Sequence, residues 1–297
     1  MSDVSTPRRI LVTGASGLVG RAVIDEILAR GADVTALDLA NPGALPADRI
    51  IVGNAADPAT VRAGLVGADA VVHLAARPSP HHGTPLEVFG GNTAATFNVL
   101  EEAGQAGVRR AVIASSYSIL GLPWAARRKH PAYLPIDEAL PLQIEDPYGL
   151  SKLVDENTAR VMADRHGMDV VALRFPFIAD REREAARLAE TIENPESGAA
   201  DCWSYLDVRD AAAAAWLSLV APLRGFHAVF VAAPQTLAPY PTEALIAAYH
   251  SASELRRPIP ERDVPIDLSA ARDLLGFAAR HVVDLDVRPL PEGGRYA

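Results

Sequence analysis

The sequence has almost no lysine, a single cysteine and no excess of positive charge. Of its 28 basic residues only Lys129 and Lys152 are lysines, and the remaining 26 are arginines. The lone cysteine, Cys202, cannot form an internal disulfide and excludes a zinc site built on cysteines. It fits a reducing compartment, so we expect a cytoplasmic protein. A formal charge of −9 argues against a nucleic-acid or anionic-membrane binder, because such a protein needs a basic face.

Long hydrophobic runs are missing as well. The most apolar stretch, Ala211–Pro222, is too short to cross a bilayer, and Met1–Arg9 lacks the apolar segment of a secretory signal. We therefore expect no membrane partner. The composition, with 49% hydrophobic and 22% charged residues, is ordinary for a globular protein, and 297 residues suit one large domain or a domain with a smaller lobe.

Short apolar runs alternate with longer amphipathic segments through the first 175 residues. The runs expected to be strands are Arg9–Thr13, Val34–Asp38, Arg49–Val52, Ala70–Leu74, Arg110–Ser115 and Val170–Arg174. The segments expected to be helices are Leu18–Arg30, Pro58–Val66, Pro85–Ala106 and Pro147–His166. This alternation predicts an α/β protein with a Rossmann-type doubly wound parallel sheet, and it places residues 1–175 in one dinucleotide-binding domain.

The pattern changes after Arg174, where we expect residues 176–297 to form a small α/β lobe. This lobe is expected to bind substrate and to return in part to the sheet edge. Its expected elements are a helix at Arg181–Thr191, a loop at Glu193–Gly198, a segment Tyr205–Val208 leading into a helix through Val220, a strand at Ala228–Val231, and helices at Thr242–Tyr249 and Ser269–Leu275. The proline-rich segment Gly121–Asp146 reads as a long loop, and such loops are usually functional or mobile.

The first expected strand runs into a helix through Gly14, Gly17 and Gly20. Glycine permits a tight turn, close approach of the backbone to a ligand and close packing of helix on strand. The helix N-terminus then offers free N–H groups and a positive dipole end to a pyrophosphate. A plain structural turn is the alternative. The strand before, the helix after and an acid at the end of the second strand favour a dinucleotide site.

That acid is Asp38. A carboxylate there accepts hydrogen bonds from both hydroxyls of an adenosine ribose and repels a 2′-phosphate, and Leu39 and Ala40 bring no arginine to compensate. The sequence therefore favours NAD over NADP. A solvated acid at a strand end is the alternative.

Tyr148 and Lys152 lie four residues apart near the start of an expected helix, and therefore on one helix face. A nearby ammonium favours the phenolate form of a tyrosine, which makes it a usable acid and base near neutrality. The same ammonium can hold the hydroxyls of a nicotinamide ribose. An arginine would present a planar fork instead of a compact ammonium, so a lysine in this arginine-rich chain points to chemistry. A surface helix pair is the alternative.

Ser115 and Ser116 close the strand that begins at Arg110. Ligands of parallel sheets bind outside the carboxyl ends of the strands, where a serine can donate to a substrate oxygen. The alternative is that the two serines only end the strand, and this interpretation suits Ser115 better than Ser116.

In combination these motifs resemble the extended short-chain dehydrogenase/reductase family, especially its NAD-dependent epimerase/dehydratase branch. The resemblance spans nearly the whole chain. The matching residues are Thr13–Gly20, Asp38, His73–Ala76, Asn92, Ser115, Ser116, Tyr148, Lys152, Leu173, Arg174, Ser204–Ala211, Asp267–Ser269 and Leu274–Phe277.

The resemblance implies roles for individual residues. Ser116, Tyr148 and Lys152 would be catalytic, with Tyr148 moving a proton while hydride passes between substrate and nicotinamide. The implied NAD-binding residues are Gly14, Ser16, Gly17, Leu18, Gly20, Asp38, Ala55, Leu74, Ala75, Ala76, Asn92, Tyr148, Lys152, Phe175 and Pro176. The candidate substrate residues are Pro78, His81, Ser116, Tyr117, Trp124 and Phe177.

Three positions depart from the family pattern. Nucleotide-sugar enzymes often have an asparagine where this chain has Phe177, and a phosphate-binding arginine where it has Trp203. On the adenine side Asn54 replaces a usual acid, although Asp57 is retained. The loss of two diphosphate contacts favours members that act on free sugar acids, lactones or small polyols and ketones.

Two loops can be interpreted either as substrate-binding or as solvated segments. His81 and His82 follow the fourth strand, and Arg127–His130 is a dense basic patch. Either loop could contact a substrate, the basic patch by attracting an anion, and either could simply be solvated. No carboxylate or third histidine stands at ligand spacing beside the histidines, so we expect no metal site.

The sequence therefore predicts an NAD-dependent oxidoreductase acting on a small hydroxy or keto compound, carbohydrate-like in character, such as a sugar acid, aldose or polyol. The alternative is a sugar or nucleotide-sugar epimerase or dehydratase that retains its NAD. A third hypothesis is a regulatory protein that senses NAD. The resemblance also implies a homodimer built from Pro85–Ala106 and Pro147–His166.

Overall fold

The structure is a computed structural model that describes residues 6–41 and 43–291. Seven parallel strands form one sheet in the order β10–β7–β5–β4–β1–β2–β3. They are β1 (Arg9–Thr13), β2 (Asp33–Asp38), β3 (Arg49–Val52), β4 (Ala70–His73), β5 (Arg110–Ser116), β7 (Asp169–Phe175) and β10 (Phe226–Phe230). The strand order reverses between β1 and β4, which is where sheets of this kind bind ligands. The predicted Rossmann-type sheet is confirmed.

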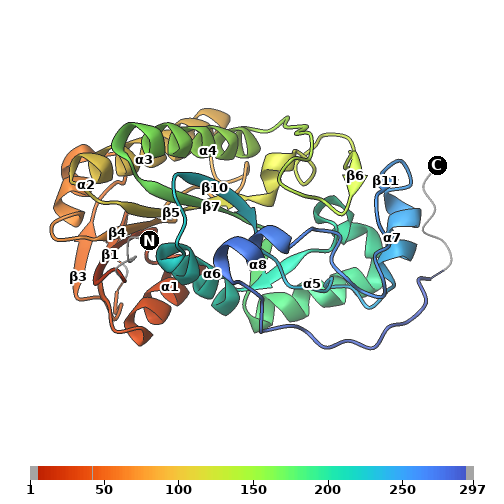
Figure 1. Cartoon of the computed structure of the whole chain (residues 1–297). Helices are drawn as coiled ribbons and strands as arrows, with labels where there is room; N and C mark the ends of the chain where they lie inside the picture. Colours follow the sequence, from red (N-terminus) through yellow and green to blue (C-terminus); the bar gives the residue numbers. More distant parts are fainter. Residues whose placement is uncertain (1–5, 42, 292–297) are drawn as a thin grey trace.

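Helices cover both faces of the sheet (Figure 1). One face carries α2 (Pro58–Gly64), α3 (Pro85–Gln105) and α4 (Pro147–His166), and the other carries α1 (Leu18–Ala29), α6 (Val208–Val220) and α8 (Ser269–Leu275). Side chains alternate along β1, so that Ile10 and Val12 enter the core beneath α1 and α6 while Leu11 enters the opposite core. Because both faces are buried, the central strands are apolar almost throughout.

A smaller lobe packs beside the carboxyl ends of the strands (Figure 1). It holds β6 (Tyr133–Leu134) paired with β11 (Glu254–Leu255), β8 (Phe177–Ala179) paired with β9 (Tyr205–Asp207), α5 (Arg181–Glu193), α7 (Thr242–Tyr249) and the 3-10 helices η1 (Tyr117–Leu120) and η2 (Pro195–Asp201). Its core joins Leu134 and Ile136 to Trp203 and Tyr240. The lobe therefore draws on the chain both before and after β7, and β10 lies at the sheet edge beside β7.

The loop expected at Glu193–Gly198 is a wrong prediction. Helix α5 continues through Glu193, and Pro195–Asp201 form the 3-10 helix η2. The side chain of Asn194 accepts a hydrogen bond from the backbone N–H of Glu196, and Pro195 presets the backbone of the first helical position. Other element ends differ by one or two residues from the expected ones, as helix and strand ends commonly do.

Membrane-spanning helices were sought over the described ranges, and none of the helices there is both long enough and apolar enough.

A buried ion pair fastens α4 to the sheet. The guanidinium of Arg174 on β7 donates through Nε and Nη2 to both carboxylate oxygens of Glu156 on α4, each at 2.9 Å. Ser115 at the end of β5 donates to the same carboxylate at 2.6 Å. Because both charges are buried, each partner satisfies a group that would otherwise be desolvated without compensation.

Replacing Arg174 with Met should therefore leave the Glu156 carboxylate buried without its cation. We expect the free energy of unfolding, measured by urea denaturation, to fall by about 3–5 kcal/mol. The matched control is Arg9→Met, because the Arg9–Asp33 pair is half exposed, with side-chain exposures of 46% and 51%. That variant should lose less than about 1 kcal/mol. Equal losses in the two variants would contradict the role given to the buried pair.

Candidate active site

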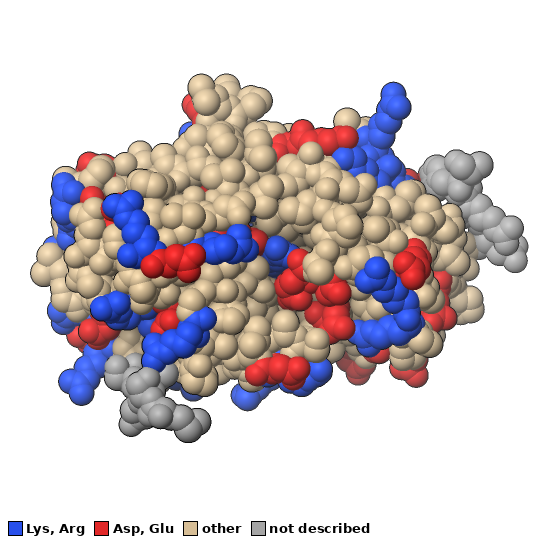
Figure 2. Space-filling model, turned by 45° about the horizontal axis from the view of Figure 1, so that its top comes forward, with Lys and Arg blue, Asp and Glu red and all other residues tan. Residues whose placement is uncertain are grey.

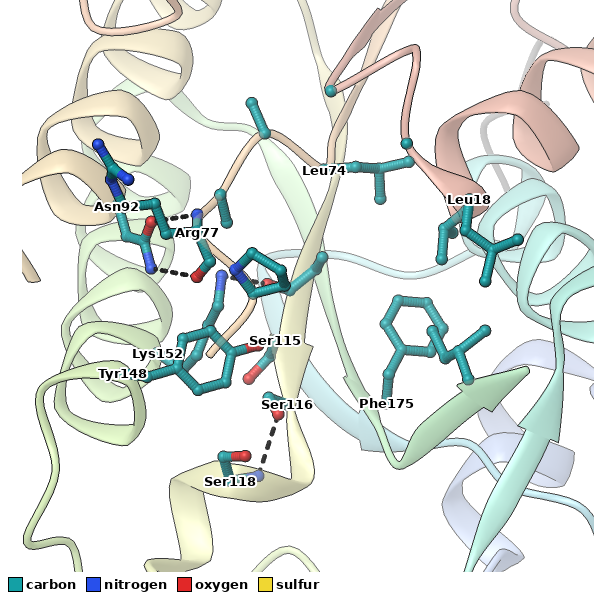
Figure 3. Close-up of a pocket in the computed structure, with 18 of the residues that line it drawn as sticks. Leu18, Leu74, Arg77, Asn92, Ser115, Ser116, Ser118, Tyr148, Lys152 and Phe175 are labelled. Atoms are coloured by element: carbon teal, nitrogen blue, oxygen red, sulfur yellow. Dashed lines mark hydrogen bonds between the residues drawn. The ribbon is translucent and has the colours of Figure 1, made fainter. Parts of the chain in front are cut away.

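A cavity of about 1200 Å³ opens along the carboxyl ends of β1, β2, β4, β5 and β7. In Figure 3, Tyr148 and Lys152 on α4 approach Ser115 and Ser116 at the end of β5, and Phe175 lies across from them. The cavity is thus lined by side chains from both faces of the sheet and from the lobe. Its position agrees with the place where open parallel sheets bind their ligands.

The glycine loop forms one end of this cavity. Gly14 has φ of 68°, and a Cβ at that position would come 2.7 Å from the backbone nitrogen of Ala75. A Cβ on Gly20 would collide with the carbonyl oxygen of Gly14. Since these collisions involve backbone rather than flexible side chains, the close approach of the loop, β4 and α1 requires glycine.

The N-terminus of α1 is left open toward the cavity. Each of the helices α2 to α6 is preceded by a side chain that caps its backbone N–H groups, whereas Gly17, the residue before α1, provides no side-chain cap and α1 has no acid in its first turn. Gly17, Leu18 and Gly20 all line the cavity. Free N–H groups at the positive end of a helix dipole fit a pyrophosphate. The residues of this loop therefore suit the dinucleotide that the sequence predicts.

Asp38 lies where the loop meets β2. Its Oδ2 accepts hydrogen bonds from the backbone nitrogen of Ser16 at 2.8 Å and from its hydroxyl at 2.7 Å. Its Oδ1 accepts from the backbone nitrogen of Leu39 at 2.7 Å. The residues that line this end of the cavity are Leu37, Asp38, Leu39, Gly53, Asn54 and Ala55, none of which carries a positive charge. A carboxylate fixed in such surroundings suits a ribose diol better than a 2′-phosphate.

The start of α4 places Tyr148 in the cavity wall. Asp146 caps the helix by accepting from the backbone nitrogens of Tyr148 at 3.0 Å and Gly149 at 2.8 Å, and Pro147 occupies the first helical position. The ring of Tyr148 lies 5.8 Å from the ammonium of Lys152. The tyrosine and the lysine therefore meet on one helix face, as their spacing predicts.

Lys152 is buried, with 4% exposure, and its ammonium has two oxygen partners. It donates to the carbonyl of Ala114 at 2.9 Å and to the carboxylate of Asp155 at 3.2 Å. Burial by itself lowers the pKa of Lys152, but the Asp155 carboxylate and Tyr148 outweigh it, so the pKa lies above the usual lysine value. The lysine therefore stays charged although it is shielded from water.

The two serines at the end of β5 differ in their hydrogen bonds. Ser115 donates its hydroxyl hydrogen to Glu156. Ser116 accepts from the backbone nitrogen of Ser118 at 3.0 Å, which leaves its own hydroxyl hydrogen to donate into the cavity. Of the two, Ser116 is the one able to donate to a substrate oxygen.

Asn92 on α3 connects the cavity wall to α4. Its side chain accepts from the backbone nitrogen of Arg77 at 2.8 Å and donates to the Arg77 carbonyl and to the hydroxyl of Ser151. Asn92 is 1% exposed. It holds the loop after β4 against the helix that carries Tyr148 and Lys152.

The cavity brings together the predicted catalytic and NAD-binding residues and all but one of the substrate residues. Those on its wall are Gly14, Ser16, Gly17, Leu18, Gly20, Asp38, Ala55, Leu74, Ala75, Ala76, Pro78, Asn92, Ser116, Tyr117, Trp124, Tyr148, Lys152, Phe175, Pro176 and Phe177. His81 is outside this wall and instead packs edge-on against the ring of Trp124, with ring centroids 5.4 Å apart. Within the basic patch, Arg128 pairs with Glu196 and Lys129 with Glu145, also outside the cavity wall.

Sequence reasoning missed several charged residues of the cavity wall. Arg77, Arg183, Arg187 and Asp201 all line it. Arg183 and Arg187 lie four residues apart on a predicted helix, which places them on one face, but their sequence does not say that this face turns inward. Among residues 6–41 and 43–291, no group of three or more histidine, cysteine or acidic side chains is arranged to hold a metal ion.

The comparisons with known proteins agree with this geometry. An L-arabinose 1-dehydrogenase (NAD(P)(+)) from Haloferax volcanii is 35% identical over 192 residues, which cover 62% of this chain and 73% of that relative. A uronate dehydrogenase from Pseudomonas putida is 33% identical over 175 residues, which cover 58% of this chain and 62% of the relative, less than two thirds of its length.

A solved structure of similar fold contains the cofactor that the cavity suits. It is a short-chain dehydrogenase/reductase superfamily protein from Agrobacterium tumefaciens with bound NAD. It has a TM-score of 0.68 at 25% identity, and the match covers 92% of this chain and 93% of that one. The model of the NAD dependent epimerase/dehydratase family matches residues 10–232, from β1 through β10. Since this match includes every strand of the central sheet, the chain belongs to the NAD dependent epimerase/dehydratase family.

Proposed function

We propose that this protein is a dehydrogenase that uses NAD to oxidise a hydroxyl group of a small, carbohydrate-like compound. The observation that carries the proposal is the buried, charged Lys152 beside Tyr148, in a cavity that also contains the glycine loop and Asp38. The two dehydrogenase relatives act, by their names, on arabinose and on uronates. We therefore propose that the substrate of this chain is a sugar or sugar acid of similar size.

NAD, when bound, supplies the acceptor for the hydride. In our proposal Gly14, Gly17 and Gly20 let the backbone approach its pyrophosphate, and Asp38 accepts from the hydroxyls of the adenosine ribose. Ala55 would lie beside the adenine, and Leu74, Ala75 and Ala76 would line the path of the dinucleotide. Phe175 and Pro176 would border the nicotinamide end. Lys152 would donate to the nicotinamide ribose.

The reacting hydroxyl is held by Ser116 and Tyr148. Ser116 donates to the substrate oxygen, and the phenolate of Tyr148 takes the hydroxyl proton as the carbon–hydrogen bond breaks and its electron pair leaves as hydride. The ammonium of Lys152 stabilises the phenolate before the transfer. The products would be the carbonyl compound, the reduced cofactor and one proton, which the Tyr148 hydroxyl holds after the transfer, so that atoms and charge balance.

Trp203 supports a substrate without a nucleoside diphosphate. Its indole is 2% exposed and donates to the carbonyl of Pro195 at 2.7 Å. The position that often carries a phosphate-binding arginine is therefore filled by an apolar side chain whose hydrogen bond is already made. Phe177 lines the cavity with a ring that has no donor for phosphate.

An exposed apolar stripe on α3 and α4 supports a homodimer as the working form. Leu86 and Phe97 lie about three turns apart on one face of α3, and Leu150 and Val161 repeat that spacing on α4. All four are exposed, with Leu86 at 78%. Figure 2 turns the side that carries these helices forward and shows a broad tan area across its upper part. We propose that a second copy covers this stripe, in the cytoplasm, where the single cysteine would stay reduced.

Tyr148→Phe tests the chemical step. Since it removes only the proton-carrying hydroxyl, we expect kcat to fall by roughly 10²- to 10⁴-fold while NAD binding, measured by calorimetry, stays unchanged. Turnover is followed as NADH absorbance over sugar acids, aldoses, polyols and nucleotide sugars. The matched control is Tyr133→Phe, whose hydroxyl donates to Asp137 outside the cavity wall. Unchanged turnover in Tyr148→Phe would exclude the mechanism, and substrate conversion without NADH would favour the epimerase or dehydratase alternative.

Asp155→Asn tests how the lysine stays charged. The variant keeps the size of the side chain but removes the carboxylate that raises the pKa of Lys152, so this pKa should fall. The charged form, present below the pKa, would then be lost at lower pH than in the wild type, and the alkaline limb of kcat/KM should move in the same direction. Nuclear magnetic resonance of ¹⁵N-labelled lysine resolves the change, because Lys129 provides the only other signal. An unmoved Lys152 titration would contradict the role of Asp155.

Phe97→Glu combined with Val161→Glu tests the dimer. Two carboxylates on the stripe should be too costly to bury, so sedimentation velocity should show a monomer where the wild type is a dimer. The matched control, Val66→Glu, changes a valine that is 62% exposed and lies outside α3 and α4. A monomeric wild type would refute the proposal directly.

A further inference from the structure

Helix α5 brings two arginines to the lobe side of the cavity. Arg183 and Arg187 are one turn apart and both line the cavity, together with Phe177, which comes from the preceding strand β8. The residues assigned to the adenosine end, Asp38 and Ala55, belong to β2 and the loop after β3. The two arginines therefore lie on the part of the wall that the cofactor motifs do not account for.

The charge of Arg187 is already matched by acids. Its Nη2 donates to Asp201 at 3.0 Å and to the carbonyl of Ser197, and its Nη1 donates to Glu190 at 3.1 Å. Burial raises the pKa of Asp201 to about 6, against the opposing effect of Arg187, so the carboxylate is ionised at neutral pH. Arg187 thus has few donors left for a ligand.

Arg183 is different. Its backbone nitrogen donates to the side chain of Asp180 at 3.0 Å, but across the described part of the chain its guanidinium makes neither a hydrogen bond nor an ion pair. The three acids on the cavity wall have other partners: Asp38 bonds Ser16, Glu87 bonds Thr84, and Asp201 bonds Arg187. Arg77, the third arginine on the wall, donates to the carbonyl of His82, and its charge adds to the Thr84 hydrogen bonds in lowering the pKa of Glu87. Within the described ranges, Arg183 is therefore the arginine of the wall whose guanidinium is left for a ligand, in a protein whose formal charge is −9.

We propose that Arg183 binds a carboxylate of the substrate, so that the preferred substrate is a sugar acid or a related hydroxy acid whose carboxylate lies away from the oxidised carbon. This rests on the proposed dehydrogenase function. The planar guanidinium matches a carboxylate with two parallel hydrogen bonds. A single unpaired arginine suits one negative charge rather than a diphosphate, because the donors of Arg187 and Trp203 are committed within the protein.

The test compares two substrates that differ at one carbon, galacturonate and galactose, in wild type and in Arg183→Ala. For galacturonate we expect kcat/KM of the variant to fall by about 10- to 100-fold, as when a hydrogen bond to a charged group is lost. For galactose it should stay within about twofold, as expected when no charged partner is removed. Arg183→Lys should restore only part of the loss, because the ammonium keeps the charge without the fork.

Arg181→Ala is the matched control, since this arginine is two residues away on α5 and is outside the cavity wall. Arg181→Ala should leave kcat/KM unchanged for both galacturonate and galactose. Binding is measured separately by calorimetry of galacturonate to Tyr148→Phe with saturating NAD, with and without Arg183→Ala. We expect the second substitution to weaken this binding by the same factor as kcat/KM.

The outcomes separate the two proposals. Equal effects of Arg183→Ala on the acid and the neutral sugar, or a raised KM for NAD with both, would overturn the assignment of Arg183. A wild type that prefers galactose would overturn it as well, although the dehydrogenase function would stand. A wild type that forms NADH with neither these sugars nor other hydroxy compounds would overturn the function itself.

Discussion

The site depends on one costly requirement, a lysine that keeps its charge where water is excluded. Lys152 is 4% exposed, and burial of an ammonium favours its neutral form. The Ala114 carbonyl and the Asp155 carboxylate replace the lost water as hydrogen-bond partners. Burial, together with the charge of Lys152, lowers the pKa of His73 to about 3, so this histidine stays neutral and adds no second positive charge nearby. The charged Lys152 is therefore surrounded by its two oxygen partners and a neutral histidine.

The same requirement explains how α4 is attached to the sheet. Asp155 and Glu156 are neighbours on the helix, yet Asp155 bonds Lys152 within α4 while Glu156 bonds Arg174 on β7 and Ser115 on β5. Desolvated ionic groups lose much of their stabilisation when a partner moves. A shift of α4 along the sheet would break the Glu156 contacts, and the same contacts therefore keep Tyr148 at a fixed place in the cavity wall. The structural ion pairs and the groups proposed to react, Tyr148 and Lys152, are therefore positioned together by the packing of α4.

The features of the site that depend on the spacing of nearby residues could be predicted from the sequence. The glycine loop, Asp38 at a strand end and the Tyr148–Lys152 pair each act within one element or one strand-to-helix turn, so their order in the chain already fixes their relation. Arg181 and Arg183 show the limit, because the two residues look alike in the sequence and only the packing of α5 decides that Arg183 faces the cavity. Asp155 lies three residues after Lys152 on α4, so the same spacing rule could have identified this pair, whereas the burial that gives it its effect depends on the packing of the helix. The core of the lobe could not be predicted because the proline-rich segment Gly121–Asp146 is only weakly periodic, although it contributes Leu134 and Ile136 to that core.

The hydrogen-bond acceptors around Arg174 and Lys152 explain why one position has an arginine and the other one of the two lysines. Arg174 is buried where both oxygens of Glu156 stand side by side, and a planar guanidinium meets them with two parallel donors. Lys152 is buried where one carbonyl oxygen and one carboxylate oxygen converge on a point. A guanidinium there would carry five N–H donors into a place with too few acceptors, and each unpaired donor would cost free energy. The choice between the two cations at these positions therefore follows the geometry of the acceptors, which composition alone does not reveal.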